Sequence, residues 1–228
     1  MNAKALKIIA VITMTIDHVG LYLLAYDSPG YIACRIIGRI AFPLFAFMIA
    51  EGFYHTRNVN KYFCRLLGYC LAIELGFLGF YLVSGDNYLL EMNVIWPLLL
   101  GLASLMLLSR PQWYLKLLVI VILIGSELLN LAYGAYGIGL IIVFGIYRNF
   151  RVQALMLILL NLFFLDWPLL EPMGLGELAK YGWLQWFSVV ALLPRYFYNG
   201  QPGKLSKWFF YVYYPAHLGV IYILSLII

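Results

Sequence analysis

Charged residues are scarce in this sequence, and that scarcity excludes most soluble folds. Only 11% of the 228 residues are Asp, Glu, Lys or Arg, whereas about 25% is typical of a soluble domain. The hydrophobic share is 64%, and the mean hydropathy is +0.90. Period-two alternation over about ten residues, which marks a membrane-spanning strand, is absent. The composition therefore predicts an all-α polytopic membrane protein, a bundle of transmembrane helices.

Cysteine is nearly absent too, and the few that occur do not suggest disulfides or zinc. Cys34, Cys64 and Cys70 form neither a CxxC pair nor a zinc-ligand spacing. Free cysteine inside an apolar helix behaves as a small hydrophobic side chain, so we expect all three to serve packing. The histidines and acids also lack an HExxH pattern or a comparable one. No metal is therefore expected.

Long connections are missing as well, so we expect one transmembrane domain over residues 1–228. The chain has no linker, low-complexity segment or convincing internal repeat. Its apolar runs approach the length of about 20 residues that a membrane-spanning helix needs. We predict about nine crossings, with limits near 6–26, 32–54, 62–84, 92–109, 113–131, 133–147, 152–166, 176–194 and 208–228.

The basic residues are distributed unevenly between the expected connections. Twelve of the 15 Lys and Arg residues fall in alternate connections, on one side of the membrane, and most acids fall on the other side. The positive-inside rule then places the N-terminus in the cytoplasm and the C-terminus outside. The net charge of +5 is thus explained by topology, and nucleic acid is not an expected partner. The twelve are Lys4, Lys7, Arg57, Lys61, Arg65, Arg110, Lys116, Arg148, Arg151, Arg195, Lys204 and Lys207.

Against this apolar background, two ionisable residues occur in the middle of the first predicted crossing. Asp17 and His18 would lie close to the membrane midplane. A carboxylate there costs at least a few kcal/mol, so it needs a partner or a function. The two residues are about 100° apart around a helix and do not face each other. A relay in which Asp17 orients His18 is therefore not expected.

Two arginines of the second predicted crossing lie at a similar depth. Arg35 and Arg39 are spaced i, i+4, so they share one face of a continuous helix. An ion pair between Asp17 and Arg39 is geometrically possible, either as a contact that fixes helix register or as part of a site. Arg35 is expected to bond the connecting loop or the lipid headgroups, or to belong to the same site.

Two more ionisable groups, Glu74 and His217, reach the same layer from the third and ninth predicted crossings. Because histidine titrates near neutral pH and is the usual general base, His18 is the expected catalytic base. Glu74 is a better candidate than Asp17 for orienting it. The alternative is that His18 only bonds a backbone carbonyl. Glu51 and Glu127 lie near helix ends, where either can reach the interface.

On the expected cytoplasmic side, turn and basic residues gather in two connections. The segment 198–204 reads as a turn, and it joins Lys207 and the loop around Arg57 in a cationic rim. The rim is either the positive-inside signal alone or a dock for an anionic cosubstrate. The glycine cluster at 134–139 does not match GxGxxG and is expected to be a tight turn or a close packing contact.

Several stretches together resemble the TraX family. They are Met14–His18, the block Arg35–Phe47 continuing through Glu51–Phe53 to Thr56–Asn58, Gly134–Gly137, Tyr198–Gly200, and Tyr211–Leu218. Their order covers nearly the whole chain. The GRIAFPLFAF-to-TRN block is the specific part, whereas MTIDH and YPAHL are short and weak.

This resemblance implies an integral acetyltransferase of the bacterial cytoplasmic membrane that uses acetyl-CoA. The implied acceptor is the N-terminus of a pilin-like protein or another amine or hydroxyl. The resemblance implies that His18 is the catalytic residue, with Asp17 beside it and Arg35 and Arg39 in the family block. Together with Glu74 and His217, which are expected at the same depth, Asp17, His18 and Arg39 make up the predicted catalytic group. Residues implied to bind acetyl-CoA or the acceptor are Arg35, Arg57, Lys61, Asn199, Lys204 and Lys207. The turn departs from the family at Gln201, where a basic residue is usual, so Lys204 would have to substitute.

Two other classes of function fit the same residues. A proton-coupled transporter would use the intramembrane charges as a relay, but no inverted repeat is visible. A non-catalytic assembly factor for a pilus or a secretion machine would keep the register-fixing charges and would not need His18. The acceptor's identity and the oligomeric state do not follow from the sequence.

Overall fold

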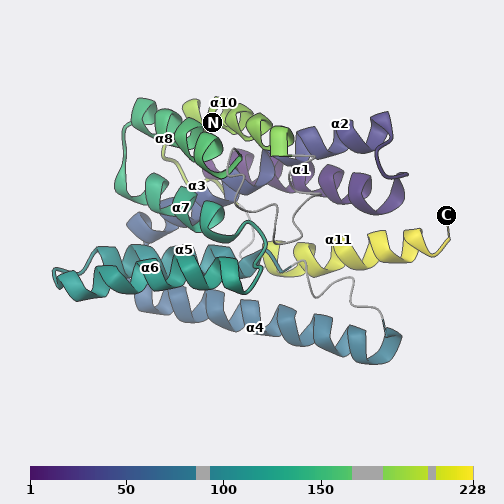
Figure 1. The fold of residues 1–228 in the computed structure, drawn as a ribbon, viewed down its shortest axis with the longest axis horizontal. Coiled ribbons are helices and arrows are strands. Elements are labelled where there is room, and N and C mark those ends of the chain that lie inside the picture. Colours follow the sequence, from purple (N-terminus) through teal and green to yellow (C-terminus); the bar gives the residue numbers. More distant parts are fainter. Residues whose placement is uncertain (86–92, 166–181, 205–208, 228) are drawn as a thin grey trace. The chain divides into compact units, whose positions relative to one another are not determined.

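The computed structural model describes residues 1–85, 93–165, 182–204 and 209–227, and this part of the chain is helical without a strand (Figure 1). The all-α prediction is therefore confirmed there. The elements are α1 (Ala3–Leu23), α2 (Pro29–Gly38), α3 (Ala41–His55), α4 (Val59–Ser84), α5 (Ile95–Leu108), α6 (Trp113–Leu128), α7 (Gly134–Ile146), α8 (Phe150–Leu165), the 3₁₀ helix η3 (Gly182–Ala191), α10 (Leu192–Tyr196) and α11 (Phe209–Ser225).

Three helical stretches are long and apolar enough to cross a membrane. They are α1, the run Pro29–His55 that contains α2 and α3, and α4. These stretches indicate a membrane protein. Four other apolar helices, α5, α7, α8 and α11, are shorter. The number of crossings and the cytoplasmic N-terminus stay predictions.

The chain divides into two compact units. Unit 1 comprises Met1–Phe45 and Phe150–Ile228, and unit 2 comprises Ala46–Asn149. The boundary falls inside α3. The prediction of one transmembrane domain over 1–228 stays a prediction.

In unit 1, α1 and α2 run side by side and approach each other closely (Figure 1). A Cβ added at Gly20 would overlap Cys34, and one added at Gly38 would overlap the carboxyl group of Asp17. Glycine at these two positions lets the backbones come within reach, as small residues do between membrane helices. Cys34 therefore serves packing, as predicted. α11 contacts α1 from another side.

The second predicted crossing, 32–54, falls within the apolar run Pro29–His55, but this run consists of two helices with a break between them. α2 ends at Gly38, Arg39 caps it, and α3 begins at Ala41. The cause is Pro43, which has no N–H to donate to the carbonyl of Arg39 and whose ring would clash with that carbonyl in a continuous helix. At the third position of α3, however, proline is tolerated, because the first N–H groups of a helix have no intrahelical partner. Arg39 thus lies at the break.

The eighth predicted crossing, 176–194, is also different from a plain α-helix. Its described part is the ten-residue 3₁₀ helix η3 followed by α10, and its first residues lie outside the described residues. Residues three apart line up in a 3₁₀ helix. Gln185, Ser188 and Ala191 accordingly share one edge of η3, where Ser188 and Ala191 are buried.

In unit 2, α5 and α7 form the core. A Cβ at Gly101 would meet Ile141, and one at Gly145 would meet Leu105, so the two helices pack closely through glycine. Phe47 and Phe144 add an edge-to-face contact, with ring centroids 5.6 Å apart. This packing buries the predominantly apolar faces of α5 and α7.

The glycine cluster at 134–139 begins α7, and the prediction of a tight turn is confirmed. Tyr133 and Gly134 both have positive φ, 61° and 40°. The side chain of Glu127 accepts a hydrogen bond of 2.6 Å from the N–H of Ala135. A carboxylate at the start of a helix accepts from a backbone N–H that has no partner within the helix, and its negative charge is stabilised by the positive end of the helix dipole. Glu127 therefore has a structural role here.

Candidate functional site

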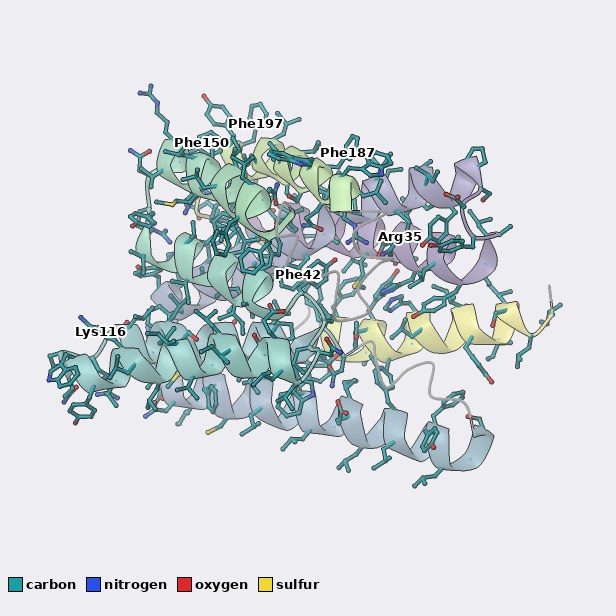
Figure 2. All side chains as sticks on the ribbon, in the orientation of Figure 1. Arg35, Phe42, Lys116, Phe150, Phe187 and Phe197 are labelled. Carbon is teal, nitrogen blue, oxygen red and sulfur yellow. The ribbon has the colours of Figure 1, made fainter. Side chains whose placement is uncertain are left out.

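Asp17 on α1 lies against both arginines of α2. Its Oδ2 accepts a hydrogen bond from Nη1 of Arg35 at 2.6 Å, and its Oδ1 lies 3.6 Å from Nη2 of Arg39. Figure 2 labels Arg35 on α2 beside α1. The predicted Asp17–Arg39 pair is present, and Arg35, expected at the loop or the headgroups as one alternative, instead makes the shorter contact. The close approach at Gly38 is what brings the carboxylate within reach.

This cluster has more positive than negative charge. One carboxylate faces two guanidinium groups, and Asp17 is 8% exposed. Arg39 also donates to the side-chain oxygen of Gln185 on η3, at 3.3 Å, and from its Nε to the carbonyl of Arg35, at 3.4 Å. Those oxygens are neutral. A group with developing negative charge would be stabilised beside the two guanidinium groups.

His18, the next residue on α1, has a different partner. Its Nδ1 lies 2.7 Å from Nε2 of His217 on α11, and the two rings are stacked with centroids 5.0 Å apart. Both side chains are buried. The expectation that Asp17 and His18 serve different partners is confirmed. The pairing of His18 with His217 was not predicted, because a sequence shows the depth of a residue but not which helices are neighbours.

The hydrogen bonds of His217 fix which nitrogen of His18 is free to act as a base. Nδ1 of His217 lies 3.0 Å from the carbonyl of Tyr213, which can only accept, so this nitrogen carries a proton. With both rings neutral, Nε2 of His217 is then the acceptor, and Nδ1 of His18 donates to it. The proton positions are inferred from this network. Nε2 of His18 is left with its lone pair, which is the form a general base needs.

Tyr213 contacts both α1 and His217, and so supports the hydrogen-bonded histidine pair. Thr15 donates its hydroxyl proton to the carbonyl of Val11 at 2.8 Å, so the 2.8 Å contact between Thr15 and the Tyr213 hydroxyl has tyrosine as donor. The Tyr213 ring is stacked on His217 at a centroid distance of 5.3 Å. α1 and α11 are thus joined by two polar contacts, one at Thr15 and one at His18.

Glu74, predicted to orient His18, belongs to unit 2. There it accepts hydrogen bonds from Nδ2 of Asn93 at 2.6 Å and from the indole N–H of Trp96 at 3.0 Å. These contacts join α4 to the start of α5. The predicted role of Glu74 beside His18 stays a prediction, and the partner that the structure gives to Nδ1 of His18 is His217.

Glu51 is more buried than its position near a helix end suggested. It is 7% exposed and forms an ion pair with Arg148, and its Oε2 lies 3.3 Å from Nε2 of His55. The guanidinium of Arg148 stands over the ring of Tyr54, 4.6 Å from the centroid, and the Tyr54 hydroxyl donates to the carbonyl of Gly145. This network ties the end of α3 to the end of α7 inside unit 2.

The residues implied to bind acetyl-CoA lie in separate parts of the chain. Arg57 and Lys61 are exposed in unit 2, while Asn199 and Lys204 are exposed in unit 1. Asn199 accepts a bond from the N–H of Gln201 at 3.2 Å and donates its own N–H to the carbonyl of Met1 at 2.9 Å. The turn therefore packs on the start of α1. Lys207 lies outside the described residues.

Within the described residues, no group of three or more His, Cys, Asp or Glu side chains gathers as metal ligands do. The expectation of a metal-free site stays a prediction.

Polar residues that the sequence reading passed over join α8 to the segment after it. Asn161 donates to Ser188 at 3.0 Å, and Arg195 donates to the side-chain oxygen of Gln153 at 3.0 Å. Asn161, Gln153 and Ser188 are fully buried. The signal was available, because amides are rare inside apolar runs and mark contacts between membrane helices.

This architecture defines a helical membrane protein in which a buried carboxylate, two half-buried arginines and a buried histidine pair lie close together. The chain belongs to the TraX protein family, whose model matches residues 2–225. The family resemblance predicted from the motifs is therefore confirmed.

Two curated proteins illustrate the similarity. A probable fimbrial assembly protein FimC of Dichelobacter nodosus, serogroup H1, is 30% identical over 96% of this chain and 94% of its own length. An uncharacterised protein of Rickettsia prowazekii is 55% identical over 49 residues, which is 22% of this chain and 18% of that protein. No solved structure matches.

Proposed function

We propose that this protein is an integral membrane acetyltransferase that moves an acetyl group from acetyl-CoA to an amine or hydroxyl acceptor. The observation that supports this most directly is the hydrogen-bonded chain from the Tyr213 carbonyl through His217 to His18. It orients a buried imidazole with one nitrogen able to accept a proton. A residue that only fixed helix packing would not need that arrangement.

The proposed reaction needs a base because an amine or hydroxyl must lose a proton as it attacks. Acetyl-CoA would supply the acetyl group as a thioester. Nε2 of His18 would take the acceptor's proton as the acceptor forms its bond to the acetyl carbon, and would give that proton to the sulfur as the carbon–sulfur bond breaks. His217 would hold the ring in the required tautomer. The products are the acetylated acceptor and CoA thiol, so atoms and protons balance.

The arginine cluster would act on the negative charge that develops on the thioester oxygen. Asp17 neutralises one of the two guanidinium charges, and Arg35 makes the shorter of its two contacts. We propose Arg39, whose contact with Asp17 is the longer one, as the group that meets the developing charge. Preorganised charge in a site that excludes water is among the largest contributions to catalysis.

The proposed cosubstrate would be held at the cytoplasmic rim of the bacterial inner membrane. Arg57, Lys61, Lys204 and Lys207 are the basic residues proposed to meet its phosphates, and Asn199 is proposed to bind the cosubstrate as well. Exposed cations bind phosphate by charge-assisted hydrogen bonds. Arg35 is proposed to support the acetyl end through Asp17.

The proposed acceptor is the N-terminus of a pilin-like protein or another amine or hydroxyl. Support comes from the relative described as a probable fimbrial assembly protein, which matches this chain over nearly its whole length. In general terms, we propose a role in pilus biogenesis. More specifically, we propose that the protein acetylates a pilin subunit.

The same relative favours a second candidate, a non-catalytic assembly factor. That relative is described as a probable fimbrial assembly protein. Such a protein would use the Asp17–Arg35 pair to fix α1 against α2 and would not depend on the basicity of His18.

The test is acetyl-CoA turnover by the purified protein in nanodiscs. CoA release and transfer of radiolabelled acetyl to membrane extract would be followed for the wild type and for folded His18→Ala. We expect the variant to lose about 10²–10⁴-fold in rate, as removal of a general base does. Equal rates would remove His18 from the reaction. If neither protein binds acetyl-CoA or releases CoA, the assembly role is favoured. A transporter is favoured in that case only if a proton gradient also drives solute flux.

A further inference from the structure

Unit 2 contains two neighbouring open clefts that the proposed acetyl transfer does not use. The first has a volume of about 400 Å³, is lined mainly by apolar side chains such as Leu105, Leu108 and Ile146, and includes Lys116. The second, of about 230 Å³, includes Met106 and Arg110. Phe53 and Ser109 line both, so the clefts adjoin. The larger one is in the size range of small-molecule sites, roughly 300–1,000 Å³.

The clefts lie where helix ends of unit 2 meet. Phe53 and Ser109 come from the last turn of α3 and the residue after α5, and Val59 and Lys116 come from the first turns of α4 and α6. Figure 2 shows Lys116 near the start of α6. The connections at these ends carry basic residues, so the positive-inside rule assigns them to the cytoplasmic boundary of the membrane.

The charge on the lining has one sign. Among the described residues that line the two clefts, none is acidic. Arg110 and Lys116 have no ion pair or side-chain hydrogen bond within the described part of the chain. Arg148, by contrast, is paired with Glu51 and stands over Tyr54. Two cations thus stand at an apolar groove without a counter-charge.

We infer that these clefts hold one anionic phospholipid, with its phosphate between Arg110 and Lys116 and its acyl chains along the apolar lining. Basic pockets between helices on the cytoplasmic side are typical sites for acidic lipid headgroups. A lipid matches both halves of the groove, since its phosphate meets the cations and its chains cover Leu105, Leu108 and Ile146. A water-soluble phosphate would match the cations alone and leave the apolar side chains without a partner. The start of α4 adds the weak positive charge of a helix N-terminus.

The inference depends on the expected topology and not on acetyl transfer, so the two can fail separately. The probe is phosphatidylglycerol, with zwitterionic phosphatidylcholine as comparison. Native mass spectrometry of the delipidated full chain in detergent would count the bound lipid at increasing lipid concentration. We expect one phosphatidylglycerol to bind at least tenfold more tightly than phosphatidylcholine, because the positive charge of choline is repelled by the two cations of the groove.

The variants separate a site from a general surface charge. Arg110→Gln with Lys116→Gln is expected to weaken phosphatidylglycerol binding by tenfold or more. Lys4→Gln with Arg65→Gln removes the same number of cations outside the clefts and is expected to leave binding unchanged. If the first pair unfolds, Leu108→Trp provides a second route, because it fills the groove and keeps both charges. That variant should also weaken binding.

Three outcomes would overturn the inference. Equal loss in both double variants would mean that only the charge of the rim attracts the lipid. Equal binding of phosphatidylglycerol and phosphatidylcholine would remove the role of the two cations. Displacement of bound lipid by adenosine 3′,5′-bisphosphate would make this a nucleotide site. Acetyl-CoA turnover, measured on the same samples, does not enter this decision.

Discussion

At the scale of single residues, the proton on Nδ1 of His217 decides what His18 can do. The Tyr213 carbonyl fixes that proton, and the effect passes through Nε2 of His217 to Nδ1 of His18. In serine hydrolases a carboxylate orients the histidine in a comparable way. Here the orienting group is a neutral ring. A neutral partner holds the tautomer without adding a further charge to a membrane-embedded site.

Replacement of His217 tests this chain directly. His217→Gln keeps a side-chain oxygen that can accept from Nδ1 of His18, whereas His217→Leu keeps the bulk and loses the acceptor. We expect the first to retain turnover within about tenfold and the second to lose on the order of 10²-fold, because the base is then misaligned. CoA release would be measured on proteins with matched thermal unfolding. Equal rates for the two variants would show that the contact is only packing.

The Asp17 cluster leads to a prediction that separates stability from chemistry. Asp17→Asn removes the buried carboxylate that faces the half-buried guanidinium groups of Arg35 and Arg39, so the free energy of unfolding should fall by about 3–5 kcal/mol. Arg39→Gln keeps the 2.6 Å pair of Asp17 with Arg35, so the fold should survive. Its turnover should fall about 10²–10³-fold if Arg39 stabilises developing negative charge.

Thermal unfolding in nanodiscs and CoA release, measured side by side, check both variants. If Arg39→Gln unfolds as readily as Asp17→Asn, Arg39 has a structural role. If it turns over at the wild-type rate, the excess charge does not act on the substrate.

At the scale of helices, the break at Arg39 lies beside the buried site. A helix that spans without interruption would bond the carbonyl of Arg39 to the N–H of residue 43. Pro43 has no N–H for that bond, so α2 ends and a new helix, α3, begins at Ala41. Interrupted helices inside a membrane are tolerated where they are buried in protein or line a cavity. The break therefore sets the position of the Arg39 side chain relative to α1.

Pro43→Ala should restore the missing bond and let α2 and α3 merge. We expect the variant to unfold at the same temperature or a higher one and to lose about tenfold or more in turnover, since Arg39 would rotate with the new helix. Pro97→Ala is the matched control, because Pro97 is likewise the third residue of a helix, α5. It should leave turnover unchanged. Loss of stability in Pro43→Ala without loss of rate would contradict this account.

Hydrophobic runs and charge placement predicted most elements of the described chain, but not their irregularities. The runs at 6–26 and 62–84 correspond to α1 and α4 within a few residues. The break at Arg39 was missed because Pro43 was read inside a long apolar run, although its own chemistry marks the boundary. The 3₁₀ form of η3 was missed because hydropathy does not distinguish it from an α-helix.

For the candidate site as well, the sequence predicted which residues lie at one depth but not which of them are in contact. Depth along each helix placed Asp17, His18, Arg39, Glu74 and His217 in one layer. The structure brings four of them together within unit 1, whereas Glu74 belongs to unit 2. Which groups touch depends on how each helix is rotated. One sequence does not contain that rotation, so the histidine pair and the role of Gln185 emerged only from the structure.

At the scale of the whole molecule, the expected topology is the property with the most direct test. In a cysteine-free background, Asp27→Cys and Lys204→Cys would be probed with a membrane-impermeant thiol reagent. The positive-inside rule predicts that position 27 is labelled in intact cells and position 204 only after the cells are opened. The opposite pattern would invert the orientation, and labelling of both in intact cells would change the number of crossings.

The contact between Gly38 and Asp17 has a consequence for how an acceptor reaches His18. With no side chain at position 38, α1 and α2 touch so closely that neither can slide or separate without breaking the ion pairs of Asp17. The two helices would move as one rigid body. α11 is joined to α1 through the Thr15–Tyr213 and His18–His217 contacts, and η3 is joined to α2 through the Arg39–Gln185 hydrogen bond. Because none of these contacts is a carboxylate–guanidinium pair, we expect an acceptor to reach His18 past α11 or η3 and not between α1 and α2.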